Sequence, residues 1–225
     1  MEFKQVVGDR RTIRFFEPNE PVEPEKIQVM LEAANRASRA VNADFIKAIV
    51  CYRDELSDDV REQLKTPTTT VQLDLAPVAI FWYGDLTFAE GAQDRLKELT
   101  DLGALPVTHG WSHAYVDEVA YAQVVEPLSK DTTASIWAVS VECGLAIAQA
   151  MLAGVDEGLG VGLHAFNSAV AKEALGCPTP GCRCGCCWSA TRPRTAWRAA
   201  SGPVDRCRRA TTAGGTAHAG RRSPR

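Results

Sequence analysis

Residues 131–154, DTTASIWAVSVECGLAIAQAMLAG, decide the fold class of this chain. Their apolar side chains recur at helical spacing and leave scarcely a polar face; they include Ile136, Val139, Val141, Leu145, Ile147 and Met151. A helix that is apolar nearly all round is buried on several sides, either inside a large core or at an oligomer interface. The sequence therefore predicts a long buried helix over residues 131–154.

Helices and strands alternate on the N-terminal side of this helix. Apolar residues at helical spacing predict a helix over residues 24–38, and the polar stretch 54–65 is typical of a solvated helix. The apolar runs 48–52 and 77–83 predict two buried strands. This alternation predicts an α/β or α+β fold.

A third strand and a last helix are predicted after the long helix. Gly158-Leu159-Gly160 leads into the expected strand over residues 161–166. Asn167 or Ser168 can then cap a short helix that ends at Gly176.

Residues 85–130 do not follow the alternation. A charged amphipathic piece over residues 88–101 is followed by an aromatic-rich stretch that contains Trp111, His113 and Tyr115. We expect this segment to be an insertion or lid rather than core. Its three aromatic side chains either stack on a flat aromatic substrate or pack within the lid, and the sequence leaves both open.

Residues 1–176 are enough for one domain with a sizeable core. They lack the apolar run of a signal peptide and the ~20 uninterrupted apolar residues of a membrane span. Only Cys51 and Cys143 fall in this part, so we expect buried apolar thiols in a reducing cytoplasm. No metal-ligand spacing and no catalytic acid, base or nucleophile stands out, and we expect no membrane and no nucleic acid as partner.

Residues 178–225 differ in composition from the rest. They carry ten Arg, no Lys and one Asp, net +9, whereas residues 1–177 carry 15 Lys and Arg against 27 Asp and Glu, net −12. Without Leu, Ile, Phe, Met or Tyr they are a poor basis for a packed core. A one-base shift near the codons of Gly176 and Cys177 permits the buried-strand pattern Val-Trp-Val-Leu-Leu-Val, closed by Gly-Tyr-Pro. We interpret residues 177–225 as an out-of-frame tail rather than a native domain.

An alternative keeps this tail as a functional segment. Its arginines would contact nucleic acid, or a soft metal would bind its cysteines with His218; the cysteines are Cys182, Cys184, Cys186, Cys187 and Cys207. Their spacing fits no standard zinc module, which favours the shifted frame.

The sharpest local signal for chemistry is Asp9-Arg10-Arg11-Thr12-Ile13-Arg14-Phe15-Phe16. Guanidinium groups around a hydroxyl suit a phosphate, because Arg presents a planar fork to phosphate oxygens and stays charged. Taken alone, such a cluster is more often a solvated basic face than a site.

Joined to other segments, the cluster resembles one family, the FMN-dependent nitroreductases. It looks like the family's Arg-Arg-Ser-x-Arg-x-Phe, and Ala37-Ser38-Arg39-Ala40-Val41-Asn42 is similar to its Ala-Pro-Ser-x-x-Asn segment. Leu75-Ala76-Pro77-Val78-Ala79-Ile80 and the long helix with Gly158-Leu159-Gly160 follow in the family's order. The resemblance implies an α+β fold of three layers, with a central mixed sheet flanked by helices, in an intertwined homodimer.

The resemblance also implies which residues bind FMN. The phosphate and ribityl chain would lie on Arg10, Arg11, Thr12 and Arg14, and the ribityl or ring edge on Asn42. His164 and Ala165 would offer backbone groups near flavin N5, and Thr68 would stand where an Asn commonly meets the flavin. Asp44 replaces a family Gln, which would bring a negative charge near the pyrimidine edge.

The implied function is a flavin oxidoreductase. Hydride would pass from NADH or NADPH to a small electron-poor aromatic, a nitroaromatic or quinone, in a ping-pong scheme. No catalytic side chain is required, because the cofactor supplies the redox chemistry. A flavin dehydrogenase or reductive dehalogenase on the same fold is the alternative within this class.

Overall fold

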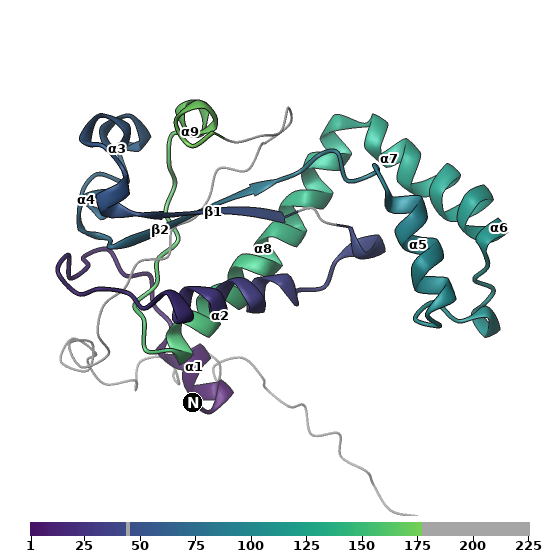
Figure 1. Ribbon diagram of the computed structural model, residues 1–225, viewed down its shortest axis with the longest axis horizontal. Coiled ribbons are helices and arrows are strands. Elements are labelled where there is room, and N and C mark those ends of the chain that lie inside the picture. Colours follow the sequence, from purple (N-terminus) through teal and green to yellow (C-terminus); the bar gives the residue numbers. More distant parts are fainter. Residues whose placement is uncertain (44–45, 177–225) are drawn as a thin grey trace, which may run out of the picture. The chain divides into compact units, whose positions relative to one another are not determined.

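The predicted long helix forms as α8, Thr132–Asp156, in a computed structural model that describes residues 1–43 and 46–176 (Figure 1). Asp131 caps it, because Oδ1 of Asp131 accepts the N–H groups of Thr133 at 2.9 Å and Ala134 at 3.0 Å. The helix ends before Gly158, whose φ of +82° is a left-handed conformation that glycine adopts without strain.

The other elements surround α8 in the following chain order, where η marks 3-10 and π helices. They are α1 (Phe3–Asp9), α2 (Pro24–Asn35), η1 (Ala40–Asn42), β1 (Ile46–Tyr52), η2 (Arg53–Glu55), α3 (Asp58–Leu64), α4 (Gln72–Leu75), β2 (Val78–Gly84), α5 (Ala92–Asp101), η3 (Val107–His109), α6 (His113–Tyr115), η4 (Val116–Val125), α7 (Glu126–Lys130) and, after α8, α9 (Ser168–Ala174).

Most predicted elements are confirmed with shifted ends. The predicted helix over 24–38 ends earlier, at Asn35, and the one over 54–65 divides into η2 and α3. Helix α1 was not predicted from the sequence. Helix α9 begins after Asn167, but the Asn167 side chain makes no cap; it donates to the carbonyl oxygen of Gln63 at 3.2 Å instead.

The two predicted buried strands pair with each other. β1 and β2 are antiparallel, with Ile46 opposite Gly84 at one end and Tyr52 opposite Val78 at the other. The expected mixed sheet is not what the described residues form, since β1 and β2 make a two-stranded antiparallel sheet. The three-layer arrangement and the dimer stay predictions.

Strand β2 is buried on both faces because its side chains alternate between two hydrophobic clusters. Val78, Ile80 and Trp82 belong to the cluster that contains residues of α2 and α8. Ala79 and Phe81 belong to a second cluster with residues of α3 and α9 and with Phe166, whose ring meets that of Phe81 edge to face at 5.2 Å. A continuous apolar run in β2 is thus explained by burial on two sides.

Small residues allow α8 to approach its neighbours closely. A Cβ atom on Gly154 of α8 would lie 3.0 Å from Sδ of Met30 in α2 and 2.9 Å from Cγ1 of Val161. A Cβ atom on Gly84, at the end of β2, would overlap Val139 of α8. By length and composition α8 would also pass for a membrane-spanning helix, but core helices of soluble proteins do so too, and α8 contacts α1, α2, α7 and both strands.

The third predicted strand is wrong within the described residues. Residues 161–166 join neither β1 nor β2. The backbone oxygen of Val161 accepts instead from the N–H of Ile13 at 3.0 Å, and the N–H of Asn167 donates to the carbonyl oxygen of Leu64 at 2.9 Å. The segment is therefore held by a loop and a helix end rather than by the sheet.

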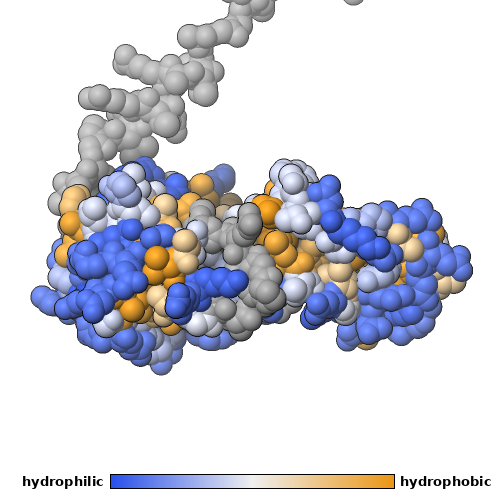
Figure 2. Space-filling view, turned by 90° about the horizontal axis from the view of Figure 1, so that it is seen from above, coloured by the Kyte–Doolittle hydropathy of each residue, from blue (hydrophilic) through white to orange (hydrophobic). Residues whose placement is uncertain are grey.

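Residues 85–130 form α5, η3, α6, η4 and α7, where α5, α6 and α7 each contact η4. Figure 2 shows that the surface over this part is largely hydrophilic. Its inner side is not: Phe88, Leu96 and Val116 are buried in the same cluster as α2 and α8. The segment thus contributes to the core, unlike the expectation of an insertion outside it, and its role as a lid stays a prediction.

Candidate cofactor-binding site

The predicted Arg-rich segment lies beside the segment that follows α8, 150 residues further along the chain. The N–H of Ile13 donates to the Val161 oxygen at 3.0 Å, and the Ile13 oxygen lies 3.0 Å from Nε2 of His164. A Cβ atom on Gly162 would lie only 2.5 Å from the Ile13 oxygen, so this approach requires glycine. The structure thus brings together Arg10, Thr12, Arg14, His164 and Ala165.

His164 is buried, with 9% of its surface exposed. Burial lowers its pKa; the contact with the Ile13 carbonyl opposes this, and the charge of Arg14 lowers it further. A neutral imidazole with its proton on Nε2 donates to the Ile13 carbonyl. The side chain therefore holds the Arg-rich segment in place, whereas Ala165 beside it is exposed.

Arg10 and Arg14 are the residues whose charge fits an anionic ligand. In the described part of the chain neither guanidinium group pairs with a carboxylate; the recorded side-chain bond of Arg14 is a long one of 3.5 Å to the Thr12 oxygen. Arg11 differs, because its Nη1 donates to the backbone oxygens of Gly8 at 2.6 Å and Arg10 at 2.8 Å. Cations left without a carboxylate partner beside a hydroxyl suit a phosphate group.

Thr68 lies in a tight turn over residues 66–69, next to the same segment. The N–H of Thr69 donates to the Thr66 oxygen at 3.0 Å, and the two hydroxyl oxygens of Thr66 and Thr68 are 3.3 Å apart. Thr69 is 1% exposed, while Thr68 is exposed. Asn167 bonds to Gln63 and Leu64 at the end of α3, which ties the 161–167 segment to the approach of this turn.

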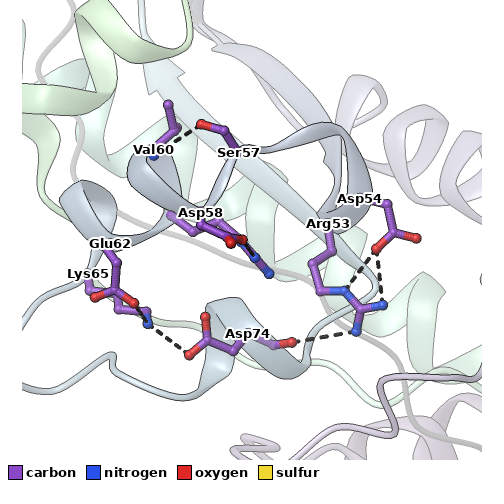
Figure 3. A network of polar contacts seen from close by, with 9 residues as sticks. Arg53, Asp54, Ser57, Asp58, Val60, Glu62, Lys65 and Asp74 are labelled. Atoms are coloured by element: carbon purple, nitrogen blue, oxygen red, sulfur yellow. Dashed lines mark hydrogen bonds and ion pairs between the residues drawn. The ribbon is translucent and has the colours of Figure 1, made fainter.

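A polar network fixes both sides of the turn (Figure 3). Lys65 pairs with Asp74 of α4 at 2.8 Å and also with Glu62 of α3. The hydrogen bond with Asp74 is the main cause that raises the pKa of Lys65, followed by the bond with Glu62. Arg53 donates to the Pro18 oxygen at 3.0 Å, which ties the chain after the Arg-rich segment to the end of β1.

Asn42 ends a second, strained turn, Ala40–Asn42. Val41 and Asn42 have φ values of 52° and 51°, and the left-handed region is unfavourable for a β-branched residue such as Val41. Two distant side chains hold the turn. Oε1 of Glu142 accepts the Ala40 N–H at 2.8 Å, and Nη1 of Arg95 donates to the Asn42 oxygen at 3.3 Å. Asp44, the next predicted site residue, lies outside the described residues.

The three predicted substrate residues lie together in and before α6. The rings of Trp111 and Tyr115 meet edge to face at 5.2 Å, and Nε2 of His113 lies 2.8 Å from Oδ1 of Asp101. Trp111 also packs against the main core cluster. These contacts are those of packing within residues 85–130, and a role in binding substrate stays a prediction.

The cysteine and metal predictions agree with the described residues. Cys51 and Cys143 are buried and free, and burial raises the pKa of Cys51 to about 11, which disfavours the reactive thiolate. No group of three or more His, Cys, Asp or Glu side chains within residues 1–43 and 46–176 is arranged to hold a metal ion. The cysteines of the tail and His218 lie outside the described residues.

Sequence reasoning missed Glu142 and Arg95. A signal for Glu142 was present, since it is the single charged residue between Asp131 and Asp156 in an otherwise apolar helix. Arg95 gave no such signal, because a charged residue on an amphipathic helix is usually a solvated one.

Comparisons with known proteins agree with this geometry. The model of the nitroreductase family matches residues 7–188. The candidate nitroreductase YdfN of Bacillus subtilis superimposes with a TM-score of 0.70 at 19% identity, over 91% of this chain and 96% of that one. A candidate nitroreductase from Exiguobacterium sibiricum, solved in complex with FMN, gives 0.67 at 18% identity, over 86% and 89%.

A third solved structure, a candidate NAD(P)H:FMN oxidoreductase of Staphylococcus epidermidis, gives a TM-score of 0.64 at 17% identity, over 86% and 88% of the two chains. A search of curated proteins gave no match. The fold and the paired Arg-rich and 161–167 segments define an oxidoreductase scaffold with a cradle for an anion. The chain belongs to the nitroreductase family.

Proposed function

We propose that this protein is an FMN-dependent oxidoreductase that takes hydride from NADH or NADPH and passes it to a small electron-poor aromatic, a nitroaromatic or quinone. The observation that carries the proposal is the pair of guanidinium groups, Arg10 and Arg14, without carboxylate partners in the described residues and beside the 161–167 segment. The FMN complex of the Exiguobacterium relative and the name of the Staphylococcus one support the choice of cofactor and donor.

The residues present fit a flavin phosphate. Arg10 and Arg14 offer two forks of N–H donors, and Thr12 offers a hydroxyl for which the described residues record no partner. Asn42 and Thr68, held by their turns, would meet the ribityl chain or the ring, and His164 and Ala165 would present backbone groups to the reduced edge. When bound, FMN supplies the hydride chemistry.

No proton transfer by a side chain is assigned. His164 is neutral and donates to a backbone carbonyl, so it orients the Arg-rich segment rather than exchanging protons with substrate. The donor and the acceptor would use the same site in turn, which is a ping-pong scheme. Trp111 and Tyr115 would present ring faces and edges to a flat acceptor.

A homodimer belongs to the same proposal. Three large apolar side chains of α8 lie on one exposed face, one turn apart: Trp137 is 71% exposed, and Val141 and Leu145 are each 47% exposed. A core helix that leaves such a stripe uncovered needs a partner. A second copy of this chain is the partner that we propose, with α8 at the interface between the copies.

The proposal is tested by FMN titration of the full-length protein with Arg14→Ala and Arg10→Ala. Each change removes a charge-assisted contact, worth about 1.5–3 kcal/mol, so the Kd of FMN should rise about tenfold or more. Arg36→Ala is the matched control, because Arg36 is exposed and its loss changes the net charge equally. Equal affinities of the Arg14 and Arg36 variants would contradict the phosphate assignment.

The shifted-frame hypothesis concerns residues 177–225, which lie outside the described residues, and it stays a prediction. A missing strand would remove several buried side chains at ~1.5–3 kcal/mol each, comparable with the ~5–15 kcal/mol stability of a domain. Resequencing the gene across the codons for Gly176 and Cys177 tests it. If a base is restored, the restored protein should retain FMN more strongly than the 225-residue chain.

A further inference from the structure

Glu142 is a buried carboxylate in the middle of an apolar helix. It is 9% exposed, and neighbouring residues of α8, Val139 and Cys143, face the end of β2 at Gly84. Its Oε1 accepts the N–H of Ala40 at 2.8 Å, across 102 residues of sequence. Its Oε2 is buried without a hydrogen-bond partner in the described part of the protein.

Such a group costs stability. Burial raises the pKa of Glu142, and the Ala40 N–H and the charge of Arg39 only partly offset this, so ionisation is harder in the folded chain than in the unfolded one. The folded state therefore binds the proton more tightly, and the free energy of unfolding falls as pH rises from the ordinary carboxyl range through the raised pKa. A Leu at this position would avoid the cost, because buried charges are often replaced by apolar residues without loss of stability.

The contact that Glu142 makes explains its presence. The Ala40 N–H is the first donor of the turn that places Val41 and Asn42 in left-handed conformations, which cost roughly 1–2 kcal/mol per non-glycine residue. A strained turn persists only where its surroundings determine it. A carboxylate on the most extensive helix of the core provides a fixed acceptor for the turn's first amide.

We infer that Glu142 is the positioning residue of the Ala40–Asn42 turn and, through it, of Asn42 in the cofactor site. It acts without touching the cofactor, and the inference that this sets flavin affinity rests on the proposed function. Arg95 holds the other end of the turn at the Asn42 oxygen, from the exposed side of α5. The turn is thus fixed from the core helix at its start and from residues 85–130 at its end.

The test compares Glu142→Leu, which removes the acceptor, with Glu142→Gln, which keeps a neutral acceptor oxygen, in the full-length protein. Hydrogen exchange of the amides of residues 40–43 is measured without FMN. We expect about tenfold faster exchange in E142L than in the parent protein, and near-parental exchange in E142Q, because only E142L leaves the Ala40 N–H without an acceptor. Unchanged exchange in E142L would overturn the inference, whatever the cofactor.

FMN titration of the same variants gives the second measurement. The Kd should rise about tenfold in E142L and at most twofold in E142Q, while the Tm of E142L stays at or above the parental value. A general structural role would instead lower the Tm and the affinity together, and that result would overturn a positioning role. Glu157→Gln, at the C-terminal end of α8, is the matched control and should leave all readings unchanged.

The pH profile separates the charge from the shape of the side chain. In the parent protein FMN affinity should fall with acidification as the carboxylate is protonated, above the ordinary carboxyl range, because a charge-assisted bond to the Ala40 N–H becomes a neutral one. Arg39 is the charged side chain of the described residues that acts on Glu142, and it stays charged at any working pH. E142Q should lack this step, and the same step in E142Q would assign it elsewhere.

If the parent protein fails to bind FMN, the proposed function fails, while the exchange experiment still decides the role of Glu142 in the turn. If the parent protein binds FMN and E142L binds it equally well, the proposed function stands and the positioning role in the site is wrong.

Discussion

The two faces of α8 have similar apolar composition and opposite environments. On one face Val139, Cys143 and Ala146 are buried at 0–1% exposure, against β2 and the main core. On the other face Trp137 is 71% exposed, with Val141 and Leu145 below it. Hydrophobicity alone therefore does not tell which face a single chain covers. The shape of the partner decides: Gly84 lets the strand reach Val139, whereas nothing lies near Gly144 on the outer face.

The largest expected effect comes from placing a charge on the outer face. Val141→Glu puts a carboxylate from each copy into the proposed interface, where an unpaired buried charge costs about 3–5 kcal/mol. We expect the protein to change from dimer to monomer in light scattering at micromolar concentration, with its helix content retained.

Val107→Glu is the matched control for this change, because Val107 is 73% exposed and lies in η3, away from α8. It adds the same charge and should leave the assembly unchanged. A Val141→Glu protein that stays dimeric would place the interface elsewhere on the molecule.

A smaller effect is expected on the inner face from Gly84→Ala. The added Cβ atom would overlap Val139 of α8, and overpacking of this kind costs ~1–3 kcal/mol. The free energy of unfolding in urea should fall by that amount, in the monomeric Val141→Glu background as well as in the parent. An unchanged unfolding midpoint would mean that β2 and α8 separate at no cost, contrary to the packing described.

The smallest effect is expected from Gly144→Ala. In one chain the added methyl group meets nothing within 4 Å, and Ala is better than Gly inside a helix by ~0.5–1 kcal/mol. Thermal unfolding in the Val141→Glu background should show this gain. If the gain disappears in the parent protein, the second copy lies against Gly144; a loss in the monomeric background would show that the outer face is not free in one chain.

The family follows from short motifs, and local structure from periodicity. The long helix, α2 and both strands were predicted because their apolar spacing leaves few alternatives. The strand over residues 161–166 was wrong, since an apolar run with glycines suits a strand but also suits a segment pressed against a loop. Here the Ile13 backbone took its hydrogen bonds.

The candidate site was predicted in part. The cluster at Arg10, Thr12 and Arg14 was visible as a local motif, and the structure places it beside His164, as the order of motifs implied. The partners that hold Asn42 were not visible, because Glu142 and Arg95 lie 100 and 53 residues away in the sequence and contact the turn only in the folded chain. The lid expectation failed in its inner half, where Leu96 and Val116 are buried in the core.

The sequence by itself determined the periodicity of the elements, the cationic character of the segment from Arg10 to Arg14, and the contrast in composition after Gly176, because these are properties of neighbouring residues. The tertiary structure alone decided which face of α8 is covered, that β2 is buried on both faces, and that a helix carboxylate holds a distant turn. Those depend on contacts between residues far apart in sequence, where close packing and a single hydrogen bond select one arrangement among many compatible with the same local pattern.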